Sequence, residues 1–380
     1  ASRFYNLVGC YNITNGKVHP VRDDLNYPIS LKMNVLPRNI PPSNHNSISN
    51  GASLDFLAVG DITTDAFIRL KDAKVNCDLD ESKCQICLSF GDKVPYEFAE
   101  VIYGVGNAAN AAVAAAKLGL KSALAADTGD DEPGKKSREA MRKAGVETGY
   151  ISLHHGIPSN YHFVLWYESE RTILVKHEKF PRRFPDISPP KFLYLSSLGE
   201  DTAGYHLEIE NYLRKHPDIQ LVFQPGTFQI KLGLEKLRGI YERTSIFVAN
   251  REEVGRILGI KTTDTGDLAR KMRAEGPRLI VITDGPRGAY AYDGKELWFV
   301  PPYPDPKPPY QRTGAGDAFA STFTSAIILG QTIPEALRWG AVNSMSVVQQ
   351  LGAQRGLLNR SQISKYLDSA PGSFKPKRII

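Results

Sequence analysis

A glycine-rich run near the C-terminal end carries the clearest chemical signal of the chain. It comprises Thr313, Gly314, Ala315, Gly316 and Asp317, and the apolar residues after it recur at helical spacing, which predicts a helix that begins there. Unpaired backbone N–H groups at a helix start bind anions, and glycine lets a phosphate approach closely. A carboxylate there would repel the anion unless it accepts a proton from the attacking group. The run therefore predicts phosphoryl transfer to an alcohol with Asp317 as base; the alternative is a carboxylate that only complements the helix dipole.

A second glycine-containing run lies in the first third of the chain. It includes Gly104 and Gly106 and continues into an alanine-rich segment, where Asn110 stands one turn into the predicted helix. The glycines permit a tight backbone turn, and the Asn110 amide is able to reach hydroxyl groups. The alternative is that Asn107 caps the helix and Asn110 is an ordinary polar helix position.

Together the two runs resemble the two signatures of the PfkB/ribokinase family of carbohydrate kinases, and they stand in the family's order. The resemblance covers about residues 54–357. It implies an ATP-dependent kinase that transfers the γ-phosphoryl group to a sugar hydroxyl, with ATP and Mg²⁺ bound. The backbone N–H groups of Gly314, Ala315 and Gly316 would then hold the charge on the transferred group. A nucleoside kinase of the same fold and a non-catalytic homologue that acts as a binding module are the alternatives.

Two carboxylates directly after the first predicted strand are candidates for acceptor binding. Asp61 and Asp65 would lie at the C-terminal edge of the sheet, where open α/β folds bind ligands. A carboxylate that accepts two hydroxyls orients a sugar, although both residues could also be turn residues. The resemblance implies that Asp65, Asn110, Gly104 and Gly106 form the acceptor site.

The acceptor itself is left open by the sequence. Residues 223–226 read Phe-Gln-Pro-Gly where several sugar kinases have Asp-Pro-Asn, which weakens a plain hexose assignment. Arg171 lies in a predicted hairpin and could reach the acceptor or the transferred phosphate. We expect instead that it is a solvated partner of the neighbouring glutamates.

The nucleotide side of the site is predicted from residues after two later strands. Asn250 and Glu253 form a capping-box pattern, and the resemblance implies that they organise magnesium and phosphates, with Glu253 acting through water. Thr283, Gly285 and Gly288 resemble the family's nucleotide loop.

Two further positions bear on the nucleotide and on cations. The resemblance makes Asn343, in a late helix, a candidate contact to the base or ribose. Many family members carry an acidic residue at the position of Gln311, where a monovalent cation is bound. Here Arg312 follows, which could supply the positive charge or act as an electrophile at the transferred phosphate, so potassium dependence stays open.

Apolar strand patterns that alternate with helical ones from Leu54 onward predict how these residues are positioned. They indicate an α/β fold, ribokinase-like by resemblance, with a central mostly parallel sheet covered by helices on both faces. Segments of about 66–101 and 160–178 interrupt the alternation, and the resemblance implies that they form a small β lid, which excludes water when closed. Residues 1–53 are an extension, partly linker-like, and residues 358–380 a C-terminal tail.

Composition narrows the class of protein further. The 380 residues carry a net charge of +6 without a basic stripe, and no apolar run suits a membrane span. We therefore expect a cytoplasmic protein with neither nucleic acid nor membrane as partner. The resemblance implies a sugar or nucleoside as acceptor, with a homodimer through the lid as candidate assembly. Cys77, Cys84 and Cys87 have the spacing of zinc ligands, but a fourth ligand is missing, so we expect reduced cysteines that pack as small apolar residues.

Overall fold

The computed structural model describes residues 3–6, 9–14, 17–20, 53–77, 84–168 and 170–379. The chain divides into two units, Ala1–Ser49 and Asn50–Ile380, close to the boundary predicted after residue 53. In the first unit, an antiparallel sheet is formed by three strands, β1 (Arg3–Asn6), β2 (Gly9–Thr14) and β3 (Lys17–Pro20). The linker that we expect at the end of the extension lies outside the described residues.

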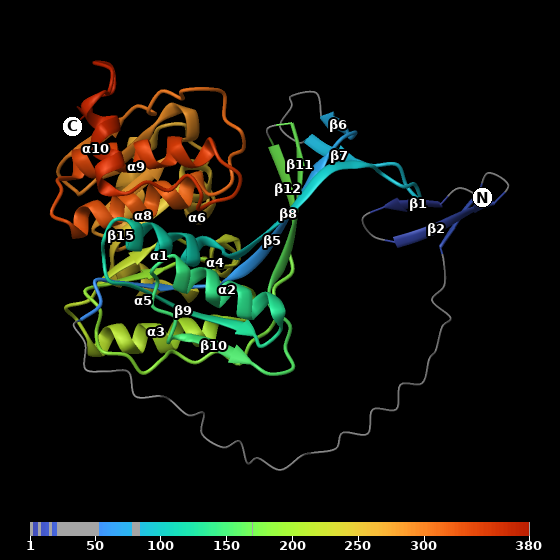
Figure 1. Ribbon diagram of the computed structural model, residues 1–380, viewed down its shortest axis with the longest axis horizontal. Helices are drawn as coiled ribbons and strands as arrows, with labels where there is room; N and C mark the ends of the chain where they lie inside the picture. The colour runs from blue at the N-terminus through green and yellow to red at the C-terminus, as the bar shows by residue number, and fades with distance from the viewer. Residues whose placement is uncertain are drawn as a thin grey trace, which may run out of the picture. The chain divides into compact units, whose positions relative to one another are not determined.

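A ten-stranded sheet forms the centre of the second unit (Figure 1). The first seven strands in spatial order run parallel to one another, and the last three are antiparallel. The expectation of a mostly parallel sheet is confirmed. The order is β10 (Ile151–His154), β9 (Ser122–Gly129), β4 (Phe56–Val59), β13 (Phe192–Leu195), β14 (Gln220–Phe223), β15 (Thr244–Asn250), β16 (Leu279–Thr283), β17 (Ala289–Tyr292), β18 (Leu297–Val300) and β19 (Lys377–Arg378).

Helices cover both faces of this sheet because the inner strands are apolar on both sides. In β4, Phe56 and Ala58 belong to one hydrophobic core and Leu57 and Val59 to the other, as the alternation of side chains along a strand requires. One core receives α1 (Asn107–Lys117), α2 (Glu132–Lys143), α8 (Ala315–Ile328), α9 (Ile333–Val348) and α10 (Arg360–Asp368). The other receives α3 (Ala203–Lys215), α4 (Thr227–Lys236), α5 (Arg238–Arg243), α6 (Arg251–Leu258) and α7 (Thr265–Ala274).

The end of the chain is part of this fold. Helix α10 packs on α9 and buries Ile363 completely. Strand β19 then pairs with β18 and extends the sheet by one strand. Residues 358–379 are therefore not the separate tail that we expected, because their apolar side chains complete a core that earlier elements leave open.

A second, four-stranded sheet forms the expected lid. Its order is β12 (Glu170–Leu174), β11 (Tyr161–Tyr167), β5 (Thr63–Leu70) and β8 (Tyr96–Val105), and these strands run side by side away from the helices (Figure 1). On one face Phe67, Val164 and Trp166 pack around Leu351 of the main body. The Trp166 ring also meets Tyr310 edge to face, with centroids 4.8 Å apart. This inner face of the lid therefore contacts the body beside the glycine-rich run.

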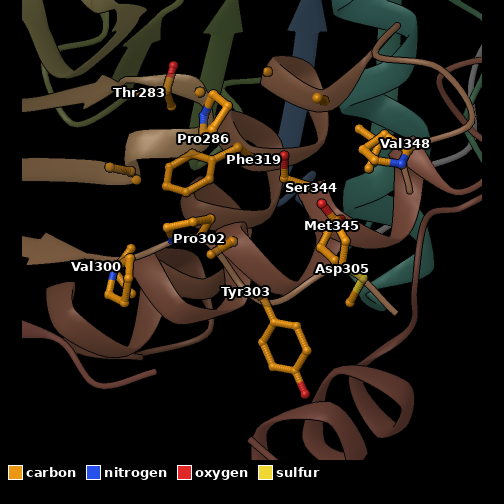
Figure 2. A pocket seen from close by; sticks show the side chains of 18 of the residues that line it. Thr283, Pro286, Val300, Pro302, Tyr303, Asp305, Phe319, Ser344, Met345 and Val348 are labelled. Atoms are coloured by element: carbon orange, nitrogen blue, oxygen red, sulfur yellow. The ribbon is translucent and has the colours of Figure 1, made fainter. Parts of the chain in front are cut away.

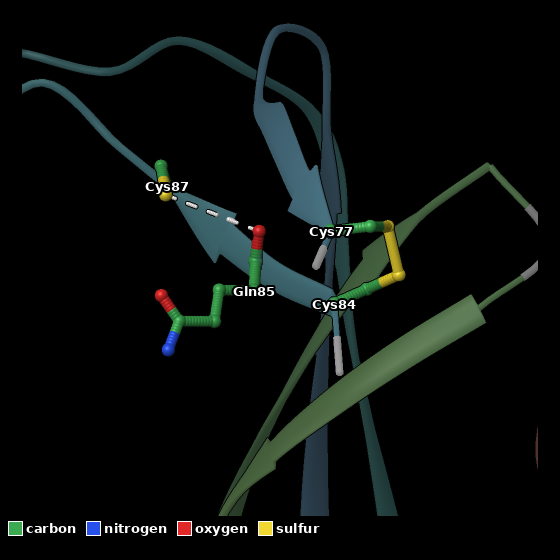
Figure 3. The surroundings of a disulfide bond; sticks show 4 residues. All are labelled: Cys77, Cys84, Gln85 and Cys87. Atoms are coloured by element: carbon green, nitrogen blue, oxygen red, sulfur yellow. Dashed lines mark hydrogen bonds between the residues drawn. A yellow bond between two sulfur atoms is a disulfide. The ribbon is translucent and has the colours of Figure 1, made fainter. Parts of the chain in front are cut away.

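A short hairpin within the first lid segment carries the cysteines. Strands β6 (Lys74–Cys77) and β7 (Cys84–Cys87) are antiparallel, and the directly opposed Cys77 and Cys84 form a disulfide (Figure 3). Cys87 keeps a free thiol that contacts the Gln85 carbonyl. Our expectation of reduced, packed cysteines is thus wrong for the bonded pair, because strand pairing brings the two side chains together on an exposed hairpin. In the described part of the chain, no helix is both long and apolar enough to cross a membrane.

Candidate active site

The glycine-rich run begins α8, as its pattern predicts. Gly314 adopts a left-handed conformation with φ of 79°, and a Cβ there would lie 2.3 Å from the Ala353 Cβ, so only glycine fits. Within the described residues no side chain caps the helix start. A Cβ at Gly316 would meet no atom within 4 Å. Ala315 and Gly316 also line a pocket, so the first-turn N–H groups are candidates to bind an anion.

Asp317, in the first turn of α8, is buried beneath this helix start and is held by three side-chain amides. Its Oδ1 accepts hydrogen bonds from Asn107 Nδ2 at 2.9 Å and from Gln224 Nε2 at 3.2 Å. Its Oδ2 accepts from Asn110 Nδ2 at 2.9 Å, and Gln354 Nε2 orients Asn110 by donating to its Oδ1 at 2.9 Å. The two glycine runs therefore meet at one carboxylate.

Burial and hydrogen bonds act in opposite directions on Asp317. Desolvation raises its pKa, whereas the amides of Asn110, Gln224 and Asn107 and the charge of Arg171 lower it. Burial prevails, so the pKa of Asp317 lies above its ordinary value. A carboxylate with a raised pKa is a stronger proton acceptor, which suits a general base.

Three side chains of the lid carry buried polar atoms without a hydrogen-bond partner among the described residues. Asp65 Oδ1, His162 Nε2 and Arg171 Nε are buried and make no hydrogen bond with the described residues; His162 Nδ1 lies 3.4 Å from Asp65 Oδ1. The charges of Asp317 and Asp65 both act on the Arg171 guanidinium, whose pKa burial lowers. Our expectation that Arg171 is solvated is wrong, because its strand turns it inward. Buried polar atoms without partners are costly, and a hydroxylated ligand would satisfy them.

Asp61 belongs to a buried ion-pair network. Arg182 bridges Asp61 and Asp127 and lies 3.0 Å from Asp127 Oδ2, and His177 Nδ1 is 3.0 Å from Asp61 Oδ2. Burial raises the pKa of Asp61, but the hydrogen bond from His177 and the charge of Arg182 outweigh it, and the pKa is lowered. Asp61 is therefore held by Arg182 and His177, whereas Asp65 lies beside His162 of the lid.

A pocket of about 550 Å³ adjoins the start of α8 on the other side (Figure 2). Phe319, Met345 and Val348 contribute apolar surface, and Ala315 and Gly316 lie in its wall. The predicted nucleotide-loop residues also line it, namely Thr283, Gly285 and Gly288. Its apolar wall suits a flat heterocycle, and its end at the free N–H groups suits phosphates.

Asn343 does not line the pocket, where the resemblance predicts a contact to the base or ribose. It is completely buried, its Nδ2 donates to Thr322 Oγ1 at 2.6 Å and its Oδ1 accepts from the Leu358 N–H at 2.9 Å. It therefore joins α9 to α8 and to the following chain, while its neighbours Ser344 and Met345 line the pocket. Helical spacing alone does not distinguish these adjacent positions.

Asn250 and Glu253 form the capping box at the start of α6. Each side chain accepts a hydrogen bond from the other's backbone N–H, both at 2.9 Å. The pKa of Glu253 is raised, mainly by burial. The hydrogen bond from the Asn250 backbone N–H and the charge of Arg256 lower this pKa, whereas the charge of Asp317 raises it. Glu253 is therefore close enough to Asp317 for the two carboxylates to repel each other.

Gln311 is buried beside the glycine-rich run. Its Nε2 donates to the carbonyl of Gln350 at 2.8 Å and lies 3.3 Å and 3.4 Å from the carbonyls of Thr313 and Gly352. A side-chain amide thus satisfies three converging carbonyl oxygens. Arg312, at the edge of the pocket, is half-exposed and lies 3.7 Å from Glu170 of the lid.

Comparison with known proteins identifies the family of this chain. The model of the pfkB family of carbohydrate kinases matches residues 73–360. The chain belongs to this family. It is similar to the 5-dehydro-2-deoxygluconokinase of Shouchella clausii, with 26% identity over 288 residues that cover 70% of this chain and 86% of the relative. The ribokinase of Bacillus subtilis is 26% identical over 279 residues, which cover 69% of this chain and 87% of the relative.

Solved structures of low identity show the same fold. A nucleoside kinase of Methanocaldococcus jannaschii superposes with a TM-score of 0.68 at 18% identity and covers 84% of this chain and 100% of its own. The Arabidopsis thaliana ribokinase solved with ribose and ATP also gives 0.68 at 18% identity, covering 83% of this chain and 99% of its own. The ribokinase-like fold is confirmed, and the pfkB chain is a phosphotransferase with an alcohol group as acceptor.

None of the three side-chain amides that contact Asp317 was predicted to do so, and Asn110 was expected only to bind the acceptor. Asn107 was considered only as a helix cap, yet Gly106 occupies the cap position. Gln224 was noted only as a departure from the family pattern. The available signal was position, since Gln224 follows β14 at the sheet edge where ligands bind.

Proposed function

We propose that this kinase transfers the γ-phosphoryl group of ATP to a hydroxyl of a sugar, with Asp317 as the catalytic base. The observation that carries the proposal is the place of Asp317. It lies in the first turn of a helix without a side-chain cap among the described residues, its neighbours Ala315 and Gly316 line the pocket of about 550 Å³, and the charge of Arg171 from the lid acts on it. One carboxylate is therefore able to reach an acceptor on the lid side while the adjacent N–H groups hold a phosphate on the pocket side.

The reaction that this arrangement supports is a direct displacement. The acceptor hydroxyl oxygen forms a bond to the γ-phosphorus while Asp317 takes the hydroxyl proton. The bond between the γ-phosphorus and the bridging oxygen breaks, and ADP leaves. N–H groups at Gly314, Ala315 and Gly316 stabilise the charge on the transferred group. The Arg171 guanidinium, close to both Asp317 and Asp65, adds positive charge from the lid side.

Glu253 fits a role in holding magnesium. Burial, and to a smaller extent the charge of Asp317, raise the pKa of Glu253, and a divalent cation beside Glu253 would stabilise its ionised form. Mg²⁺ needs only one or two protein carboxylates and retains water. Bound there, it would neutralise phosphate oxygens of ATP. Asn250 would keep the Glu253 carboxylate in place through the capping box.

The acceptor is proposed to be a polyhydroxylated sugar or sugar acid. Relatives are named 5-dehydro-2-deoxygluconokinase and ribokinase, and Asp65, His162 and Arg171 offer one anionic acceptor, one imidazole nitrogen and one cation to a hydroxylated ligand. A cytidine kinase of Thermococcus kodakarensis is 35% identical, but over only 116 residues. Nucleosides are therefore the alternative acceptors that the activity test has to include.

ADP formation from ATP, measured with a panel of sugars, sugar acids, sugar phosphates and nucleosides, tests the proposal. We expect turnover with a sugar or sugar acid that Asp317→Asn abolishes. Asp218→Asn, at an exposed loop position, should leave it unchanged. Turnover with nucleosides alone would replace the acceptor class. Absence of turnover with every acceptor, while ATP still binds, would favour the non-catalytic binding module.

We also propose that the kinase forms a homodimer through the lid. The outer lid face carries a row of apolar side chains that crosses paired strands, and Val101, Phe163 and Leu174 are 41%, 45% and 52% exposed. Light scattering should give twice the 42.0 kDa mass of one chain, and Phe163→Glu should yield monomers. Leu207→Glu, on exposed surface of α3, is the control. A monomeric wild type would contradict the dimer.

A further inference from the structure

The hydrogen bond from Gln224 to Asp317 is part of a longer chain that begins in the core. Gln224 follows β14 and is tied to the neighbouring strand, because its N–H donates to the Leu195 carbonyl at 2.9 Å. One residue earlier in β13, Tyr194 points its phenol at the Gln224 side chain, and its hydroxyl donates to Gln224 Oε1 at 2.5 Å. Adjacent parallel strands thus place a phenol directly behind the amide that contacts Asp317.

A glutamine amide can present either of two faces to a neighbour. Its NH₂ and carbonyl ends have nearly the same shape, and the surrounding network decides which points where. An ionised carboxylate only accepts hydrogen bonds, so Asp317 Oδ1 is stabilised by Gln224 Nε2 and would be repelled by Gln224 Oε1. The orientation of Gln224 therefore changes the sign of its effect on the base.

Tyr194 holds the carbonyl end of this amide. Its side chain is completely buried and stacks on Phe56, with ring centroids 5.3 Å apart. Burial, and then the charge of Asp317, raise the pKa of Tyr194 well above its ordinary value, so the phenol keeps its proton. In the described part of the chain, Gln224 Oε1 is the acceptor that this proton has, and losing it would leave a buried donor unpaired.

We propose that Tyr194 is a positioning residue for the base. Its phenol holds Gln224 in the one amide orientation that donates to Asp317 Oδ1. That oxygen then accepts from both Asn107 and Gln224, whereas Oδ2 accepts, among the residues that the structure describes, from Asn110 alone. Oδ2 therefore keeps the free lone pair and takes the proton of the acceptor hydroxyl. This inference rests on the proposed role of Asp317.

Two charged groups also act on Asp317, but neither belongs to the contacts that run from Tyr194 through Gln224. Arg171 reaches it from β12 and Glu253 from α6, and both belong to the residues proposed to bind ligands. Tyr194, from β13, acts on Asp317 through the neutral Gln224. Replacing Tyr194 with phenylalanine removes one oxygen and leaves every formal charge unchanged at neutral pH.

The test is the pH dependence of Asp317 itself. In protein labelled with ¹³C-aspartate, the Asp317 carboxyl resonance is assigned by its absence in Asp317→Asn and titrated without any substrate. Tyr194→Phe should raise its midpoint by roughly one pH unit, because Gln224 is then free to turn its carbonyl toward the protonated carboxyl and to accept its proton in a hydrogen bond, which stabilises the neutral form. The acid limb of the rate profile should move by the same amount. Tyr241→Phe removes a buried phenol on the opposite sheet face and should change neither.

A double variant shows whether the effect passes through Gln224. Gln224→Met should raise the Asp317 midpoint, and adding Tyr194→Phe to it should cause no further shift. Gln224→Glu, which places two carboxylates together, should raise the midpoint most. An unchanged midpoint in Tyr194→Phe, or the same shift with and without Gln224, would overturn the inference. Because the titration needs no turnover, a wild type that phosphorylates no acceptor would refute the proposed function separately.

Discussion

Asn110 and Asp317 are 207 positions apart in the sequence, yet the Asn110 amide donates to Asp317 Oδ2 at 2.9 Å. Each residue stands in the first turn of a helix that begins at a glycine, and the helices α1 and α8 pack together on the same face of the sheet. The contact joins the two glycine-containing runs into one site. It also means that Asn110, expected as an acceptor ligand, supports the base as well.

Replacing Asn110 should therefore impair both binding and chemistry. Asn110→Ala removes one of three amide donors to Asp317 and leaves Gln354 Nε2 without this partner. We expect kcat/KM for the acceptor to fall by about 100-fold, while KM for ATP changes little. Steady-state kinetics with each substrate varied in turn will measure this. Asn211→Ala, at an exposed position of α3, is the control, and an equal effect on both KM values would contradict the assignment.

Arg171 should act on the chemical step, whereas its neighbour Arg69 should not. Arg171 is the lid cation whose charge reaches Asp317 and Asp65, while the Arg69 guanidinium lies over the Trp166 ring, 4.2 Å from its centroid. Arg171→Ala should lower kcat by about 100-fold or more, and Arg171→Lys should recover part of it. Arg69→Ala should affect the thermal midpoint more than kcat. Equal losses of kcat in both variants would show that the lid only needs to be intact.

The Asp61–Arg182–Asp127 network should stabilise the fold in a pH-dependent manner. The folded-state pKa of Asp61 is lowered, so its contribution is present above the unfolded pKa of about 3.9 and is lost as pH falls through the lower folded value. Arg182→Leu removes the guanidinium between two buried carboxylates, which retain their contacts with His177 and His154, and should cost about 3 kcal/mol at pH 7. The cost should shrink as the pH is lowered, because protonation of the buried Asp61 carboxyl removes the charge that Arg182 compensates.

Denaturant unfolding at several pH values measures this difference. Arg183→Leu is the matched control, because its side chain is 85% exposed and pairs with Glu208 at the surface. Such pairs contribute about 0 to 1 kcal/mol. A loss in Arg182→Leu that is independent of pH would indicate packing, not charge.

Gln311 should make the kinase independent of monovalent cations. Its amide already satisfies the carbonyls of Thr313, Gln350 and Gly352, so activity should be the same in potassium, sodium and tetramethylammonium salts. Gln311→Glu replaces the donor with a carboxylate that these carbonyls repel. We expect this variant to lose activity and to regain it with potassium. Potassium activation of the wild type would contradict the expectation.

The hairpin disulfide should be visible by thiol counting. Cys77 and Cys84 are bonded and Cys87 is free, so alkylation of the denatured, unreduced protein should leave two cysteines unmodified. Reduction before alkylation should add two labels, and peptide mapping should locate them at Cys77 and Cys84. Labelling of both without reduction would show that they are thiols in the isolated protein.

Local pattern was enough to predict much of the fold. Strands that are apolar on both sides must be covered on both faces, so runs such as Phe56–Val59 indicate a helix-covered sheet before any contact is known. The break in the alternation likewise indicated the lid hairpin of β11 and β12. The end of the chain was misread, because Ile363 becomes a core residue only through contact with helices distant in the sequence.

By itself, the sequence determined the helix start at Gly314, the carboxylate within its first turn and the family to which both belong. These features are local, since glycine conformation, helix termini and apolar periodicity depend on neighbouring residues. Other features became visible only in the folded chain. Three side-chain amides converge on Asp317, namely those of Asn107, Asn110 and Gln224. Arg171 turns inward, and Asn343 turns away from the pocket. Those outcomes depend on strand order and helix packing, which bring together residues that share no local pattern.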